Sequence, residues 1–335
     1  MQYGPVMIDL KGIELLPEEG ALLKHPRVGG VILFSRNFKD IETLKSLVKN
    51  IRKEAGRSVL IAVDHEGGRV WRFHEGFTKL PPARRFGEAF DKNKEAGLNL
   101  AFHAGIIMAA ELLNCGLDMS FTPVLDLDKG VSDVIGDRAF HHDPDKVAEI
   151  AKAFIEGMKS SGMSATGKHF PGHGSIALDS HNTEPIDTRS LEAIEQDDII
   201  PFAKLKDHLG AVMPAHITYP AVDSVPAGFS RRWLQDILRK KLNFQGAIIS
   251  DCLSMQGAAI GGDFVVRAQM ALDAGCDMVL LCQQDRELVD WFLTNLNRDA
   301  SLESSLRLAK LAGLFQNAKK LSDSNHAREL LKELN

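Results

Sequence analysis

Short apolar segments alternate along this chain with longer segments that are apolar on one face only. The short apolar segments are 4–10, 28–34, 58–64, 118–126, 163–170, 210–217, 246–251 and 276–282. Between them, segments such as 40–55, 143–162 and 231–242 carry apolar residues at three- and four-residue spacing, which is typical of helices. Strands that are separated by helices usually run parallel, so this alternation predicts a parallel sheet.

Eight strand–helix repeats predict an α/β fold of the TIM (β/α)8 barrel type. No Pro/Ser-rich linker, shift of composition or internal repeat divides the chain. We therefore expect one barrel domain over residues 1–335, with C-terminal helices from about residue 300 packed on the barrel. A doubly wound sheet is the alternative, but no Gly-x-Gly-x-x-Gly motif follows the first strand.

Ionisable residues follow six of the eight predicted strands. They are Asp9, Asp64, Asp126, Lys168 with His169, His216 and Asp251. In a TIM barrel the catalytic groups lie where the strands end, on the C-terminal face. A single Asp after a strand is often only the N-cap of the next helix. Six such groups on one rim instead predict a polar cavity that is ringed by carboxylates, with a lysine and histidines among them.

The composition limits the kinds of partner that the chain is expected to bind. With 40 basic and 45 acidic residues, its net charge of −5 provides no strongly basic face for nucleic acid or anionic lipid, so we expect a small-molecule partner. No run of 18 apolar residues occurs, and the N-terminus lacks a signal-peptide pattern. These two observations predict a cytoplasmic protein that does not bind membranes. We also expect the protein to be a monomer. The cysteines form no Cys-x-x-Cys pair, so we expect reduced, buried thiols at Cys115, Cys252, Cys276 and Cys282.

The segment KHFPGHGSIALDSH, residues 168–181, is unusually rich in histidine. Its three histidines, His169, His173 and His181, allow a zinc or iron site, but an i, i+4 pair chelates mainly on a helix, and Pro171 disfavours one. A phosphate cradle is disfavoured because the Gly-Lys-Ser/Thr ending of a P-loop is absent. A solvated polar loop and a proton-transfer device are the interpretations that stay open.

Proton transfer is favoured by Asp179 and His181, which are two residues apart in the sequence and can point the same way if the loop is extended. A carboxylate beside an imidazole raises the imidazole pKa and fixes its tautomer, so this pair is a candidate general acid. Asp251 ends a buried strand and is a candidate nucleophile. A carboxylate nucleophile with a separate proton donor is what a retaining glycoside hydrolase requires.

Six motifs together resemble one family. The segments DHEGGRV, FTPVLDLD, GDRAF, KHFPGHG, DSH and SDCLSM are similar, in this order between about residues 4 and 281, to those of the single-domain bacterial β-N-acetylglucosaminidases of glycoside hydrolase family 3. The resemblance implies a TIM barrel that removes non-reducing terminal β-1,4-linked GlcNAc from anhydro-MurNAc muropeptides during peptidoglycan recycling. It also implies a retaining mechanism through a covalent glycosyl-enzyme. We expect no metal and no cofactor.

The resemblance further implies a role for each matching residue. SDCLSM places the nucleophile on Asp251, and DSH places the acid/base on His181 with Asp179 as its orienting partner. The residues that it assigns to sugar binding are Asp64, Arg72, Arg138, Lys168 and His169.

The sequence departs from the family pattern at one position, and two functions other than a hydrolase stay open. Many relatives have a second acidic residue after the nucleophile, where this chain has Cys252. A phosphorylase is one alternative, because a histidine acid/base repels phosphate less than a carboxylate does. A non-catalytic GlcNAc-binding module is the other, although the intact Asp251 and the intact Asp179–His181 pair argue against it.

Overall fold

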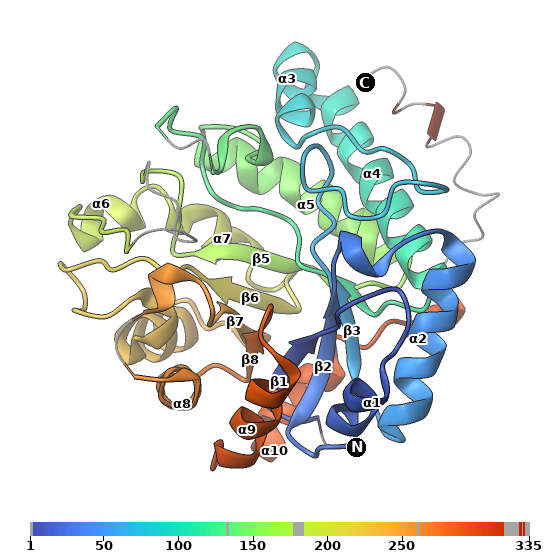
Figure 1. The fold of residues 1–335 in the computed structure, drawn as a ribbon. Coiled ribbons are helices and arrows are strands. Elements are labelled where there is room, and N and C mark those ends of the chain that lie inside the picture. The colour runs from blue at the N-terminus through green and yellow to red at the C-terminus, as the bar shows by residue number, and fades with distance from the viewer. Residues whose placement is uncertain are drawn as a thin grey trace.

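Eight parallel strands form one sheet at the centre of the computed structural model, in the order β4-β3-β2-β1-β8-β7-β6-β5 (Figure 1). The structure describes residues 3–131, 134–176, 184–259, 262–317, 328–329 and 331. The strands are β1 Val6–Asp9, β2 Val28–Leu33, β3 Leu60–Val63, β4 Met119–Ser120, β5 Thr166–Phe170, β6 Ala211–Pro214, β7 Ala247–Cys252 and β8 Met278–Leu281. Seven lie within the predicted segments and β7 extends one residue beyond its segment, so the eight-stranded α/β barrel prediction is confirmed.

The sheet closes through the chain that follows β4. Val124 forms a parallel bridge with Lys168 of β5, and the Leu125 N–H donates to the Lys168 carbonyl at 2.7 Å. The Thr166 N–H likewise donates to the Thr122 carbonyl at 2.8 Å. These bonds join the two ends of the sheet, which makes a nearly closed barrel.

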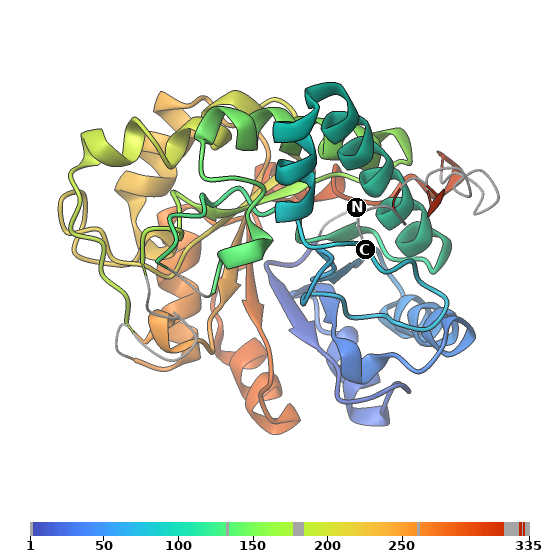
Figure 2. The ribbon, with the colours of Figure 1, turned by 90° about the horizontal axis from the view of Figure 1, so that it is seen from above.

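Helices cover the outside of the strands (Figures 1 and 2). They are α1 Pro17–Leu23, α2 Ile41–Ala55, α3 Arg84–Lys92, α4 Lys94–Asn114, α5 Pro144–Ser160, α6 Leu191–Glu195, α7 Ile199–Leu205, α8 Phe264–Ala274, α9 Arg286–Asn295 and α10 Leu302–Ala309, together with a π-helix at Arg232–Lys241. Local sequence sets their ends: the Asp40 side chain caps α2 by accepting from the Thr43 N–H at 2.8 Å. By length and composition α4 resembles a membrane span, but 67% of its apolar window is buried inside the protein, as in a core helix.

Alternation along the strands divides the apolar side chains into two clusters. Met7 and Ile249 belong to a cluster inside the barrel. Their neighbours Val6 and Ile248 belong to a larger cluster that includes the inner faces of the helices. Because both faces of each strand are buried, the strands read as continuous apolar runs in the sequence.

Helix α10 and the turn after it close the N-terminal end of the barrel. Leu308 and Leu311 pack into the inner cluster. The Gly313 N–H donates to the carboxylate of Asp118, directly before β4, at 3.0 Å. This closure leaves the opposite end, where the strands finish, as the place for a cavity.

Candidate active site

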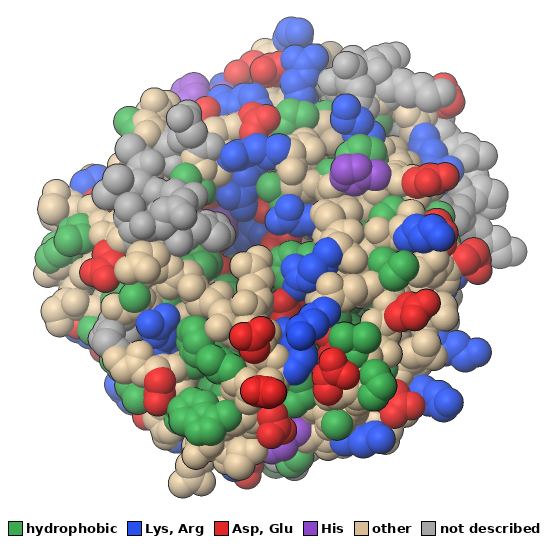
Figure 3. All heavy atoms as spheres, viewed as in Figure 1, with side chains coloured by type: hydrophobic (Ala, Val, Ile, Leu, Met, Phe, Trp, Pro, Cys, Tyr) green, Lys and Arg blue, Asp and Glu red, His purple; other side chains and the backbone are tan. Residues whose placement is uncertain are grey.

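A cavity of about 890 Å³ opens at the C-terminal ends of the strands. Its wall includes residues that end or follow four strands: Asp64 after β3, Lys168 and His169 in β5, Asp251 in β7 and Cys282 after β8. Figure 3 shows basic side chains gathered around a hollow on this face, with acidic side chains among them. The cavity is therefore polar and lies where barrel enzymes bind their substrates.

The turn after β3 brings two carboxylates to the cavity. Asp64 comes directly after the strand, and Glu66 follows two residues later. Gly67 and Gly68 then reverse the chain with φ angles of +109° and +53°, which favour glycine. A side chain at Gly67 would also meet the Pro81 carbonyl oxygen at 2.7 Å. This tight turn holds Asp64 and Glu66 on the same side of the barrel mouth.

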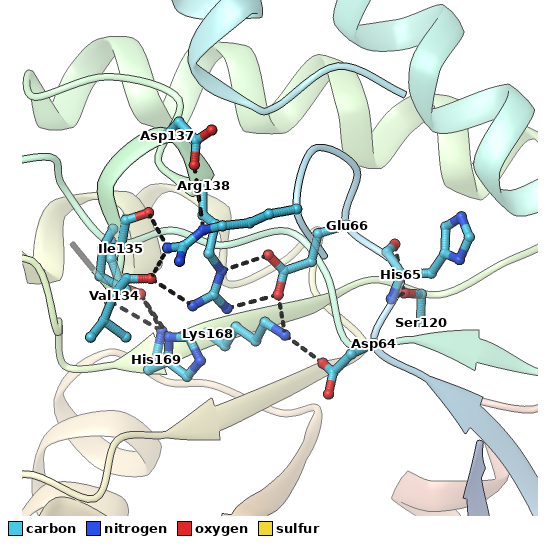
Figure 4. A network of polar contacts seen from close by, with 12 residues as sticks. Asp64, His65, Glu66, Ser120, Val134, Ile135, Asp137, Arg138, Lys168 and His169 are labelled. Carbon is cyan, nitrogen blue, oxygen red and sulfur yellow. Dashed lines mark hydrogen bonds and ion pairs between the residues drawn. The ribbon is translucent and has the colours of Figure 1, made fainter. Parts of the chain in front are cut away.

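Lys168 joins these carboxylates into a network (Figure 4). Its Nζ lies 2.6 Å from Asp64 Oδ1 and 2.7 Å from Glu66 Oε1. Arg138 binds the same Glu66 carboxylate through two N–H groups, each at 2.8 Å. Two cations thus balance two anions, and three of the four side chains are less than 15% exposed: Lys168 (3%), Glu66 (7%) and Arg138 (14%).

The charges of this network reinforce one another. Burial acts to raise the pKa of Glu66, but Arg138 and Lys168 outweigh burial and hold that pKa well below its usual range. Burial acts to lower the pKa of Lys168, but Asp64 and Glu66 outweigh it and raise that pKa. Lys168 is therefore a permanent cation at neutral pH, and its ammonium has three N–H donors, of which two are directed at carboxylates.

His169 is oriented from behind by Asp126. Its Nδ1 lies 2.7 Å from Asp126 Oδ2, and Asp126 also accepts the backbone N–H of His173 at 2.7 Å. Burial acts to raise the pKa of Asp126, but His169 outweighs it and lowers that pKa. An ionised Asp126 keeps the proton of His169 on Nδ1, which leaves Nε2 for a ligand.

Asp251 lies at the end of β7 and lines the same cavity. The Cys252 N–H donates to Asp251 Oδ1 at 2.7 Å, which fixes the orientation of the carboxylate. The carboxylate is partly exposed to the cavity. It meets the positional requirement for a nucleophile that attacks a bound substrate.

Arginines lie around the entrance. Arg36, Arg69 and Arg72 all line the cavity. Arg36 is paired with Asp9 and lies over the ring of Phe34 at 4.5 Å. The Nε of Arg72 is buried, and within the described part of the chain it has no hydrogen-bond partner. Because buried polar atoms are usually paired, Arg72 is the arginine best placed to bind a ligand.

The structure places six of the eight predicted site residues on one cavity. They are Asp64, Arg72, Arg138, Lys168, His169 and Asp251. The predicted acid/base pair, Asp179 and His181, lies outside the described residues.

Three of the predicted rim residues have structural roles instead. Asp9 is bound by Arg286 at 2.9 Å as well as by Arg36. Asp126 lies behind His169, and His216 is buried against the ring of Phe229 at 5.3 Å. The rim prediction was therefore too broad, because a strand-end position does not decide whether a side chain faces the cavity or its wall.

Sequence reasoning missed Glu66 and the placement of His173. Glu66 lies two residues after Asp64 in the same motif, and this spacing was a usable signal because alternate residues of an extended chain share a side. The sequence assigned no role in the site to His173, and the structure places it in the cavity wall. Its ring packs edge-on to that of His169 at 6.0 Å.

We predict that Glu66→Gln destabilises the protein by about 3 kcal/mol, because it leaves two buried cations without their shared carboxylate. Urea unfolding measures the change. Because the folded pKa of Glu66 is depressed, its contribution is complete above the ordinary carboxyl pKa of 4.5 and is lost as the pH falls through the folded value. The difference between variant and parent should therefore shrink in acid.

Glu88→Gln is the control for this substitution, because Glu88 forms an exposed ion pair with Arg85. We expect it to cost less than about 1 kcal/mol. Equal losses for the two variants, independent of pH, would show that the network contributes no more than a surface pair.

Comparison with known proteins identifies close relatives over almost the whole chain. A family model described as the glycosyl hydrolase family 3 N terminal domain matches residues 7–309. A β-hexosaminidase of Chromobacterium violaceum is 54% identical over 311 residues, which are 92% of this chain and 87% of that protein.

Solved structures give the same relationship. NagZ from Neisseria gonorrhoeae in complex with N-trifluoroacetyl-D-glucosamine is 41% identical, with a TM-score of 0.93 over 100% of this chain and 98% of that one. A structure of the same Neisseria protein in complex with zinc ion is 40% identical, with a TM-score of 0.92 and the same coverage. The matched region includes every described residue of the cavity wall.

Proposed function

The chain belongs to glycosyl hydrolase family 3 and is a hydrolase of β-N-acetylglucosaminides, and from this premise we propose its substrate and mechanism. We propose that it removes the non-reducing terminal β-1,4-linked GlcNAc of anhydro-MurNAc muropeptides, in the cytoplasm, as a step of peptidoglycan recycling. One observation carries the proposal: the Asp64–Lys168–Glu66–Arg138 network and the carboxylate of Asp251 share one cavity.

The network supplies the groups that a sugar ring needs. Asp64 is 24% exposed and offers carboxylate oxygens to hydroxyl groups. The third N–H of Lys168, the Nε2 of His169 and the guanidinium of Arg72 add polar contacts from other sides. Because Glu66 and Arg138 hold Lys168 between fixed charges, these groups are oriented before the sugar binds.

Asp251 is the proposed nucleophile. Its carboxylate attacks the anomeric carbon, the bond to the leaving oxygen breaks, and a covalent glycosyl ester forms. In the second step water attacks the same carbon, loses a proton to the acid/base and regenerates the free carboxylate. Two inversions at the anomeric carbon retain the β configuration.

The proposed acid/base is His181, oriented by Asp179. Both belong to the chain that follows His173 and Ile176, and His173 lines the cavity. Two residues lie between Ile176 and Asp179, and an extended chain reaches about 3.5 Å per residue. The proposal requires this pair to lie beside a sugar that is bound at Asp251, and both residues are outside the described part of the chain.

A direct test uses an aryl β-GlcNAc and a GlcNAc–anhydro-MurNAc peptide as substrates. We expect release of free GlcNAc from both, and initial product in the β configuration. The same assay in phosphate buffer separates the alternatives, because a phosphorylase yields GlcNAc-1-phosphate. Tight GlcNAc binding without turnover would instead favour a non-catalytic binding module.

We predict that chelation leaves turnover unchanged. Among the described residues, no group of three or more His, Cys, Asp or Glu side chains is arranged to hold a metal ion. Activity is measured before and after EDTA, and again after zinc is added, since a related protein has been solved in complex with zinc ion. Loss of activity in EDTA that zinc restores would contradict the metal-free mechanism.

A further inference from the structure

Two thiols lie together in the wall of the cavity. Cys252 ends β7 and follows the proposed nucleophile, and Cys282 follows β8. Both line the cavity, and their side chains are hydrogen bonded to one another. The Cys252 Sγ also lies 3.0 Å from the hydroxyl oxygen of Ser254. The proposed reaction uses neither thiol.

Strand register explains why the thiols meet. Cys252 is paired with Leu280 across the β7–β8 ladder, and Cys282 is the next residue of that chain on the same face. Diagonal neighbours of this kind are about 7–8 Å apart on one face of the sheet, so a bond between two short cysteine side chains draws the strand ends together. The thiol pair is therefore fixed by the barrel itself.

The two thiols differ in reactivity. The hydrogen bond from Cys282 lowers the pKa of Cys252 despite burial, and contact with Ser254 lowers it further. The same bond to Cys252, together with burial, raises the pKa of Cys282. Cys252 is also the more exposed of the two, so it is the thiol that forms a thiolate and reacts first.

We propose that Cys252 and Cys282 form a thiol modification site in the sugar pocket, which a low-molecular-weight disulfide such as oxidised glutathione converts into an intramolecular disulfide that stops turnover. The Cys252 thiolate attacks one sulfur of the reagent, whose S–S bond breaks and releases one thiolate. Cys282 then loses its proton and attacks the Cys252 sulfur, which releases the second thiolate. The protein loses two electrons and two protons, and the reagent is reduced to two thiols.

Modification of Cys252 affects the proposed nucleophile, Asp251, which is the preceding residue. The Cys252 N–H holds Asp251 Oδ1 at 2.7 Å, so a bond that draws Cys252 toward β8 displaces the nucleophile. A glutathione adduct on Cys252 occupies the cavity itself. Because a displacement of about 1 Å costs about 100-fold in rate, we expect a loss of that size. This activity readout rests on the proposed function, whereas the thiol readouts do not.

The test treats the whole chain with oxidised glutathione and follows free thiols, intact mass and turnover. We expect two of the four thiols to disappear, the mass to fall by two hydrogens, and a cross-linked peptide to join Cys252 to Cys282. Turnover should fall by about 100-fold and return with dithiothreitol. Bound GlcNAc should slow the reaction, because it fills the same cavity.

Two cysteine variants separate the attack of Cys252 on glutathione from the later attack of Cys282. Cys282→Ser should stop at a glutathione adduct on Cys252, whereas Cys252→Ser should keep its remaining thiols and its own turnover after the same treatment. Cys115→Ala is the matched control, since Cys115 is buried and burial raises the pKa of its thiol to about 12. It should be inactivated like the parent.

Four free thiols after treatment of the parent, or a cross-link through another cysteine, would overturn the proposal. A Cys252–Cys282 disulfide with full turnover would overturn its effect on the pocket. If the parent does not hydrolyse β-N-acetylglucosaminides at all, the mass and cross-linking results still decide the thiol site.

Discussion

Replacing Asp251 with Asn should lower turnover of an aryl β-GlcNAc by about 10³-fold or more. The amide keeps the size of the side chain but cannot attack the anomeric carbon. Because Asp64, Lys168 and His169 stay in place, binding of GlcNAc should be largely retained. Steady-state kinetics and calorimetry with GlcNAc measure the two effects separately.

Asp236→Asn is a suitable control, because Asp236 is an exposed residue that pairs with Lys240 on the outer helix. It should keep parental turnover. Near-normal turnover of Asp251→Asn would move the nucleophile to another residue, and an equal loss in both variants would point to a general effect of handling or folding.

His181→Ala should slow cleavage of the natural disaccharide far more than cleavage of a nitrophenyl glycoside. Protonation of the leaving oxygen matters most when that oxygen becomes a basic sugar alkoxide, and least when it becomes an acidic phenolate. The second step also loses its base, so the aryl substrate should give a burst of phenolate followed by slow turnover. Stopped-flow measurement of phenolate release resolves the two phases.

Azide provides the matching rescue. As an anion it needs no deprotonation, so it should speed turnover of His181→Ala and yield the β-glycosyl azide. Asp179→Asn should show the same trends more weakly, because the imidazole remains without its orienting charge. Equal losses on good and poor leaving groups, with no burst and no azide product, would leave the histidine without a role in proton transfer.

Periodicity was sufficient to predict the barrel. Most of the strands are largely apolar and buried on both faces, as β2 is, and helices such as α2 and α5 carry a regular apolar stripe, so these elements were visible without their neighbours. The two-residue strand β4 was also found, because the apolar segment around it continues to Val124, which closes the sheet against β5.

The site was predicted less completely, for a physical reason. Position after a strand places a residue at the mouth, but whether it faces the cavity depends on its partners. Asp126 and Asp9 illustrate this: the first is turned to His169 and the second to Arg286. Glu66 shows the converse, because its charge is shared between Lys168 and Arg138, which are distant in the sequence. Such pairings arise only when the barrel closes.

Closure of the barrel also brings Cys252 and Cys282 together. In the sequence Cys252 is only a departure from the acidic residue of many relatives, and Cys282 is one apolar residue among several. The register of β7 and β8 brings them together at the cavity. The pairing of adjacent strands therefore reveals this thiol pair, whereas the spacing of the two cysteines in the sequence does not.

Trapping the covalent intermediate is the most direct test of Asp251 as the nucleophile. His181→Ala is mixed with an aryl β-GlcNAc, quenched in acid during slow turnover, and analysed by intact mass and peptide mapping. We expect one N-acetylglucosaminyl group per chain, bound as an ester to the peptide that contains Asp251, and absent from the double variant with Asp251→Asn. A sugar adduct on a different residue, or a variant that turns over without any adduct, would contradict this role.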